Sequence, residues 1–277
     1  MKFLIKLSFT ILLLFLFQSC SKDVEKDSLI KKVSQEEEMI SAYEEGIKNL
    51  KSGDPFYAAK KFLEAELLFP QSNWAPKSAL MAAYSYYIQD YYVEAIFNLQ
   101  RFINTYPKNN RMDYAHYLLA MCYYEEIENE KKDLQPLILA KKEFNFIIDN
   151  YPSTDFALDS KFKINLINEV MASKEMYLGR HYIKKERWIS AINRFKNILE
   201  DYETTIYSEE AIHRLVEIHY KIGLDSEAKK YANLLGYNYL SGEWYKKSYK
   251  IFNKRYEVKK IKKEKNNIMK KFKKIFE

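Results

Sequence analysis

The sequence predicts an all-α protein, a right-handed solenoid of about five stacked helix pairs between residues 36 and 240. Only 6 glycines and 6 prolines occur among 277 residues, which is few for a loop-rich β protein. Leucine, isoleucine, lysine, glutamate and alanine fill many stretches, and these residues favour helix. A fixed pattern of alanine, apolar residues and a stop residue also returns along the chain.

The first element is a short apolar run from Leu7 to Phe17, preceded by lysines. It has the length of a signal peptide and is too short to span a bilayer of ~30 Å comfortably. The run stops at Ser19-Cys20, which is similar to a bacterial lipobox, in which the cysteine becomes the lipidated first residue. The similarity implies a signal peptide over residues 1–19, and a covalent diacylglycerol and N-acyl lipid on Cys20. An ordinary signal peptide that ends beside an incidental cysteine is the alternative.

A linker is expected over residues 20–35, and the repeats follow it. Four segments share one spacing: an alanine, apolar residues four and seven positions later, and a stop residue twelve positions after the alanine. The apolar positions lie on one helical face, and proline cannot continue a helix. The alanines are Ala58, Ala95, Ala140 and Ala191, followed by Phe62, Leu99, Phe144 and Phe195, then Ala65, Phe102, Ile147 and Ile198, and the stops Pro70, Pro107, Pro152 and Glu203; a fifth copy has Ala228, Ala232 and Leu235.

A partner helix is expected before each of these segments. Gly46, Ala83 and Gly179 lie twelve residues before their alanines, and such small residues let two helices touch closely. The stretches KSGDPF and KIGLDS indicate turns between paired helices. Helix, turn and helix in about 34 residues is the tetratricopeptide (TPR) pattern. Insertions are needed in two places: residues 129–136 lengthen the turn of the third repeat, and residues 154–173 predict a longer helix leading into the fourth.

The search for chemistry finds no catalytic signature. The sequence has no GxxxxGK[ST], GxGxxG, GxSxG or HExxH motif, so the chain is not expected to be an enzyme. Its four histidines, His116, His181, His213 and His219, are expected to be packing or surface residues, and no metal or other cofactor is expected. Cys122 lies inside a helical pattern, so it is expected to be a small buried residue.

The net positive charge of the chain comes from the C-terminal tail. Residues 241–277 carry 14 Lys/Arg and 4 Asp/Glu, a net charge of +10, while the whole chain carries +7, so residues 1–240 carry −3. A nucleic-acid-binding domain would need a basic face on its folded core, and no nucleic-acid partner is therefore expected. Apolar residues recur near helical spacing in the tail, which predicts a basic helix. It could lie on an anionic membrane, dock on acidic partners, or be simply solvated.

Binding is therefore the expected function. In a TPR stack the first helices line a concave groove. Tyrosine offers contact area with a polar tip, which suits an aromatic-rich peptide. The alternative is that half of the predicted groove residues are buried between repeats. The predicted groove residues are Tyr43, Leu80, Tyr84, Tyr87, Tyr114, Tyr117 and Tyr124, together with Ile47, Met81 and Met121.

With a lipobox cysteine, a short charged linker and five repeats, the chain resembles the BamD family, TPR lipoproteins of the outer-membrane β-barrel assembly machinery. The resemblance covers residues 36–240. It depends most on AIFNLQRFINTYPKNNRMDYAHYLLAMCYY, where a Tyr-Pro stop runs straight into a helix start, and on MYLGRHYIKKERWISAINRFKNILEDYETT. The missing proline at Glu203 departs from the pattern.

The resemblance implies a scaffold anchored by Cys20 at the periplasmic face of the outer membrane, and Ser21 implies sorting to that membrane. It also implies that the C-terminal repeats bind the periplasmic domains of a BamA-like β-barrel protein, beside other assembly-complex lipoproteins. The N-terminal repeats would receive the C-terminal targeting strand of unfolded outer-membrane proteins, which typically ends in an aromatic residue. Two alternatives are another periplasmic TPR adaptor, for example one tethering peptidoglycan enzymes, and a lipoprotein hydrolase.

Overall fold

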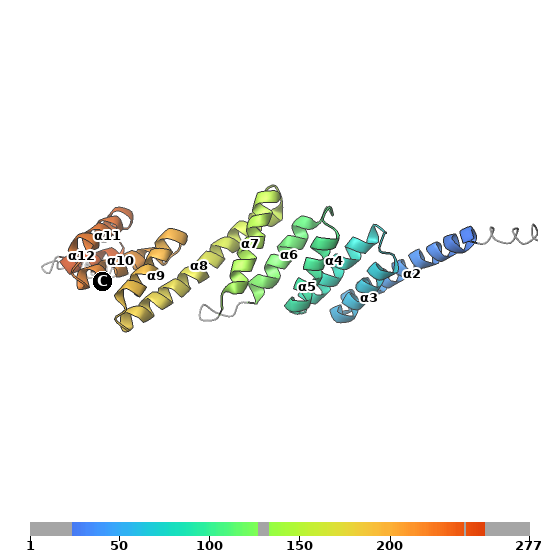
Figure 1. The fold of residues 1–277 in the computed structure, drawn as a ribbon, viewed down its shortest axis with the longest axis horizontal. Helices are drawn as coiled ribbons and strands as arrows, with labels where there is room; N and C mark the ends of the chain where they lie inside the picture. Colours follow the sequence, from blue (N-terminus) through green and yellow to red (C-terminus); the bar gives the residue numbers. More distant parts are fainter. Residues whose placement is uncertain (1–23, 127–132, 241, 253–277) are drawn as a thin grey trace, which may run out of the picture. The chain divides into compact units, whose positions relative to one another are not determined.

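The structure is a computed structural model that describes residues 24–126, 133–240 and 242–252, with side chains from residue 35 onward. Within these ranges all regular secondary structure is helical (Figure 1). The chain divides into two compact units. Unit 1 holds the residues up to 126 together with 138–160, and unit 2 consists mainly of the residues from 161 onward. Cys20 lies outside the described residues, as do residues 253–277 of the predicted basic tail.

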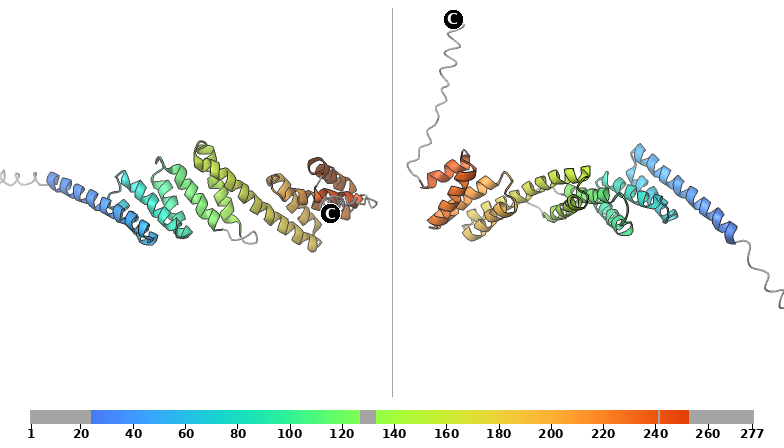
Figure 2. Two further views of the ribbon diagram at one scale, coloured as in Figure 1. Left: turned by 180° about the vertical axis from the view of Figure 1, so that it is seen from behind. Right: turned by 90° about the horizontal axis from the view of Figure 1, so that it is seen from above.

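Unit 1 contains the first three helix pairs, and each helix packs against the next from α2 to α6 (Figures 1 and 2). The long helix α2 begins ahead of the predicted first repeat, so residues 24–35 of the predicted linker are helical. The pairs are α2 (Val24–Ser52) with α3 (Pro55–Leu68), α4 (Trp74–Tyr87) with α5 (Tyr92–Thr105), and α6 (Met112–Glu125) with α7 (Gln135–Asn150).

Unit 2 contains the remaining pairs. The 30-residue helix α8 (Asp155–Lys184) begins in unit 1 and continues through unit 2. The longer helix predicted over residues 154–173 is thus continuous with the first helix of the fourth repeat. It pairs with α9 (Trp188–Asp201), then α10 (Ser208–Lys221) pairs with α11 (Asp225–Asn238), and α12 (Glu243–Phe252) packs on α10 and α11.

The stop residues act as the sequence predicts. The second helices α3, α5, α7 and α9 end at Leu68, Thr105, Asn150 and Asp201, each two residues before its stop. Helix α9 ends at the same place although its stop is Glu203 rather than proline. The end of α9 has the same contact as the end of α5, since the backbone N–H of Tyr202 donates to the carbonyl of Ile198 as that of Tyr106 donates to Phe102.

The repeated apolar positions form the core. All five alanines of the pattern are fully buried, and so are the residues four and seven positions after the first four of them. Each repeat therefore buries one face of its second helix against its first. The predicted fold class, an all-helical solenoid of TPR helix pairs, is confirmed.

Small residues on the first helices set how closely the paired helices approach. A Cβ atom built on Gly46 would lie 2.7 Å from the ring of Phe62, and one built on Gly179 would lie 2.5 Å from the ring of Phe195. Any side chain at these glycines would collide with a buried ring. The third such pair has alanine, Ala83, and a smaller partner on its second helix, Leu99.

Buried ion pairs connect successive repeats within each unit. In unit 1, Arg101 of α5 donates two hydrogen bonds, of 2.7 and 2.6 Å, to the carboxylate of Glu66 on α3. The hydroxyl of Tyr106 donates to the same carboxylate at 2.8 Å. In unit 2, the buried carboxylate of Glu210 on α10 pairs with Arg180 of α8 and with Arg214 one turn further along α10.

The turns between paired helices use the left-handed backbone region. The predicted turns contain Gly53 at φ +85° and Gly223 at φ +80°, where glycine carries no steric penalty. Asp90 and Glu186 hold the corresponding positions in the second and fourth repeats, at φ +60° and +55°.

Cys122 is fully buried in the core of unit 1, as the sequence predicts. Burial raises the pKa of its thiol to about 12. The thiol therefore stays protonated at neutral pH.

Candidate functional site

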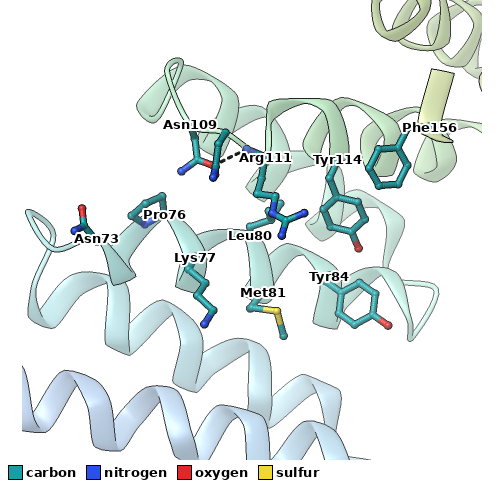
Figure 3. Close-up of a pocket in the computed structure, with 11 residues that line it drawn as sticks. Asn73, Pro76, Lys77, Leu80, Met81, Tyr84, Asn109, Arg111, Tyr114 and Phe156 are labelled. Carbon is teal, nitrogen blue, oxygen red and sulfur yellow. Dashed lines mark hydrogen bonds between the residues drawn. The ribbon is translucent and has the colours of Figure 1, made fainter. Parts of the chain in front are cut away.

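A cavity of about 670 Å³ opens on unit 1 between the first helices of the second and third repeats (Figure 3). Helix α4 supplies most of its wall, the α5–α6 connection and the start of α6 supply the opposite side, and Phe156 at the start of α8 closes one end. Its lining consists of Asn73, Pro76, Lys77, Leu80, Met81, Tyr84, Asn109, Asn110, Arg111, Tyr114 and Phe156.

Helical spacing brings the α4 residues together. Lys77, Leu80 and Tyr84 follow one another three and four positions apart, so they share one face of the helix. On the other side, the side-chain oxygen of Asn109 accepts a hydrogen bond of 2.9 Å from the backbone N–H of Arg111. This contact fixes the backbone of the connection from which Arg111 projects.

The cavity joins an apolar floor to two cations. Leu80, Met81 and Phe156 supply apolar surface, and no acidic residue is among the lining residues. The ammonium of Lys77 lies 5.0 Å from the ring centre of Tyr43 and 4.6 Å from that of Trp74. Arg111 is exposed. Across the described residues no carboxylate lies within ion-pair distance of either cation, so both are available to an anionic ligand.

Tyrosine hydroxyls add hydrogen-bonding groups to the same cavity. The ring centre of Tyr114 lies 5.6 Å from that of Phe156. Burial raises the pKa of Tyr114 to about 12, so its hydroxyl remains a donor at neutral pH. Figure 3 shows Tyr84 and Tyr114 on facing walls of the cavity. The arrangement fits a ligand with an aromatic or aliphatic side chain and a carboxylate, since cations at aromatic rings and hydroxyl donors are both present.

The structure brings some of the predicted groove residues to this cavity and places the others elsewhere. Leu80, Tyr84 and Tyr114 line it, together with Met81. Tyr43 is only 7% exposed and packs between Phe62 and Trp74, with ring centres 5.2 and 5.0 Å away. Its ring contacts the ammonium of Lys77 and does not line the cavity.

The remaining predicted tyrosines do not line the cavity. The hydroxyl of Tyr117 donates to Asp159 at 2.7 Å. The ring centre of Tyr87 lies 6.0 Å from that of Tyr92, and Tyr124 is half-buried. Sequence reasoning missed Lys77, Arg111 and Phe156. Lys77 was within reach, because it lies on the predicted face one turn before Leu80, whereas Phe156 comes from an element more than 40 residues further along the chain.

The histidines are packing residues or lie at the surface. His116 packs on Phe146 and pairs with Glu143 at 2.7 Å. His213 bonds to Ser248 and His219 to the carbonyl of Leu215, while His181 is exposed. In the part of the chain that the structure describes, no group of three or more His, Cys, Asp or Glu side chains could hold a metal ion. None of the helices described there is long and apolar enough to cross a membrane.

Stacked TPR helix pairs with an apolar, cation-edged cavity define a helical-repeat binding protein. A family model described as YfiO, outer membrane lipoprotein, matches residues 35–234. The chain belongs to this family, whose curated members carry the name outer membrane protein assembly factor BamD.

Two relatives are similar over most of their length. The chain is 40% identical to outer membrane protein assembly factor BamD of Rickettsia prowazekii over 213 residues, 77% of this chain and 85% of the relative. It is 37% identical to the protein of the same name from Caulobacter vibrioides, over 84% of this chain and 76% of that one. A solved TPR protein from Thermus thermophilus aligns over 77% of this chain and 98% of its own, at 14% identity and a TM-score of 0.34.

Proposed function

We propose that this chain acts in outer-membrane protein assembly, as the names of its relatives state for them. In this proposal it is a scaffold held by lipid on Cys20 at the periplasmic face of the outer membrane. Its unit 1 cavity receives the C-terminal targeting strand of unfolded outer-membrane proteins, and its C-terminal repeats bind the periplasmic domains of a BamA-like protein.

One observation carries the peptide-binding part: the cavity combines an apolar floor with Lys77 and Arg111 and has no lining carboxylate. A peptide that ends in an aromatic residue presents a ring and a free α-carboxylate next to each other. The ring would displace water from Leu80 and Met81, and the carboxylate would accept charge-assisted hydrogen bonds from the two cations. The proposed ligand thus matches the cavity in both polarity and charge.

The direct test is binding of a synthetic peptide that ends in phenylalanine, compared with the same peptide amidated at its C-terminus. We expect the free acid to bind roughly tenfold or more tightly, since a hydrogen bond to a charged group contributes about 1.5–3 kcal/mol. Lys77→Gln and Arg111→Gln should each weaken binding of the free acid and leave binding of the amide unchanged. Lys108→Gln is the matched control, because Lys108 is exposed in the same connection and does not line the cavity.

Equal affinity for the two peptides would remove the carboxylate part of the proposal. The partner part has its own test, affinity purification from detergent-solubilised outer membranes followed by mass spectrometry. Near-equal recovery of a large β-barrel protein with repeated periplasmic domains is the expected result. Recovery of amidases or hydrolases without it would favour the adaptor for peptidoglycan enzymes.

The anchor is tested separately. Cys20→Ala should leave the helical content unchanged and release the protein from the membrane fraction into the periplasm. Retention of this variant in the membrane fraction would contradict anchoring by lipid alone.

A further inference from the structure

One end of unit 2 brings two inter-helix turns together. The α8–α9 turn and the α10–α11 turn meet there, because the ammonium of Lys221, the last residue of α10, lies 4.3 Å from the ring centre of Trp188, the first residue of α9. The two turns therefore form one continuous surface, which we call the basic tip. It consists of Lys184, Lys185, Arg187, Ile189, Lys221 and Leu224.

The basic tip mixes cations with exposed branched apolar side chains. Lys184, Lys185 and Arg187 are exposed and have no ion-pair partner among the residues that the structure describes. Ile189 is 75% exposed and Leu224 is 49% exposed. Two acids, Glu186 and Asp225, lie in the same turns, so cations outnumber acids by four to two.

The last described residues also lie at this end of unit 2. Helix α12 runs alongside α10 in the same direction, since Trp244 and Ser248 contact His213 and Phe252 contacts Tyr220. Residues 253–277, which follow Phe252, carry 11 Lys/Arg and 3 Asp/Glu. Phe252, the last described residue, thus lies near the end of α10, and the most basic stretch of the sequence follows it along the chain.

We propose that the basic tip docks on an anionic phospholipid surface, as a second membrane contact beside the N-terminal lipid. Basic side chains near an anionic bilayer gain attraction from its surface potential. Exposed isoleucine and leucine beside a tryptophan can enter the headgroup boundary, where amphipathic surfaces bind. A single anionic bilayer surface accommodates both the cations and the exposed Ile189 and Leu224 without a matching pocket, and this favours the lipid surface.

The test uses the chain from residue 20 onward with Cys20→Ala, so that neither the apolar run of the signal peptide nor an acyl chain can contribute, and co-sedimentation with vesicles. Vesicles of phosphatidylcholine with one third phosphatidylglycerol are compared with vesicles of phosphatidylcholine alone. We expect binding to the anionic vesicles only, weakened by salt because the charges are exposed. The triple variant Lys184→Gln, Lys185→Gln, Arg187→Gln should bind at least ~10-fold more weakly, and Ile189→Ser should weaken binding about threefold.

A matched control neutralises three exposed lysines elsewhere, Lys60→Gln, Lys108→Gln and Lys161→Gln, and should bind as the parent does. Circular dichroism should show unchanged helix content in all variants, since every altered side chain is exposed. The proposal is overturned if the parent does not sediment with anionic vesicles. It is also overturned if the tip variants bind as well as the parent while a chain ending at Phe252 does not, because the tail alone would then be the contact. The proposal is independent of the unit 1 cavity.

Discussion

The two units pack the paired helices of a repeat in the same way, but they connect successive repeats differently. Inside the repeat, unit 1 places Gly46 on Phe62 and unit 2 places Gly179 on Phe195, with nearly the same close approach. Between repeats, unit 1 buries Glu66 on a second helix, and unit 2 buries Glu210 on a first helix. The size-matched apolar pair thus returns in the first, second and fourth repeats, while each buried ion pair is particular to one contact, or joint, between successive repeats.

The largest expected effect comes from removing the carboxylate at the unit 2 joint. Glu210→Ala removes the acceptor that Arg180 and Arg214 share. Arg180 is half exposed and Arg214 keeps Glu217 as a partner, so the loss of these charged hydrogen bonds should cost about 2–3 kcal/mol of the free energy of unfolding. The measurement is chemical denaturation, with Glu200→Ala as an exposed acidic control. A loss no larger than that of the control would show that the joint does not depend on the ion pair.

The close helix approach is tested next. Gly179→Ala would place its Cβ 2.5 Å from the buried ring of Phe195 and should cost about 1–3 kcal/mol through overpacking. Adding Phe195→Leu recreates the combination of Ala83 with Leu99 found in the second repeat, and should recover part of the loss. Additive effects of the two substitutions would contradict a size-matched pair.

Acid should weaken the unit 2 joint through a neighbouring carboxylate. Burial alone would raise the pKa of Glu217, but His213 and Arg214 outweigh it and lower the pKa to about 2. A lowered pKa in the folded state means that the stabilisation is complete above the unfolded value of 4.5 and is lost as the pH falls towards 2.

We expect a loss of about 1 kcal/mol over that window, reduced by solvent because the Glu217 side chain is 39% exposed. Denaturation at pH 6, 4 and 3 measures it, and Glu217→Gln should flatten the slope. An equal slope in that variant would assign the acid sensitivity to other carboxylates.

The smallest effect concerns the turns. Glu186 adopts a left-handed backbone conformation at φ +55°, as Gly223 does at φ +80°. This conformation carries a steric strain energy for glutamate that glycine avoids. Glu186→Gly should therefore raise the free energy of unfolding by about 0.5 kcal/mol, because relief of strain exceeds the added freedom of the unfolded chain. Gly223→Ala should lower it by about 1 kcal/mol. A shift in the melting temperature in the opposite direction for either variant would contradict this account.

The sequence predicts the interior of the repeats well because one periodic rule governs it. The alanines, their apolar partners and the stop residues all occupy the predicted places, and Gly46 and Gly179 meet the rings that lie on the following helices. The joints follow no such rule. Glu66 and Arg101 are 35 residues apart, and nothing in the spacing of either one singles out the other.

The candidate site is intermediate between these cases. Tyr84 and Tyr114 could be placed at the cavity by counting along first helices, but the same count placed Tyr43 there, whose ring turns into the core instead. Sequence spacing predicts the side of the helix on which a residue lies. It does not predict where along the helix a neighbouring helix packs and buries that residue. Arg111 lies in a connection, where no period applies.

The buried thiol of Cys122 can serve as a built-in probe of local opening in the folded protein. Thiol reagents attack the thiolate, and a pKa of about 12 in a fully buried position suppresses that form while the surrounding helices stay closed. In the Cys20→Ala chain Cys122 is the sole cysteine. The rate at which a reagent labels Cys122 would then report how often α6 opens. One labelling reaction could therefore measure local opening in the repeats that form the cavity.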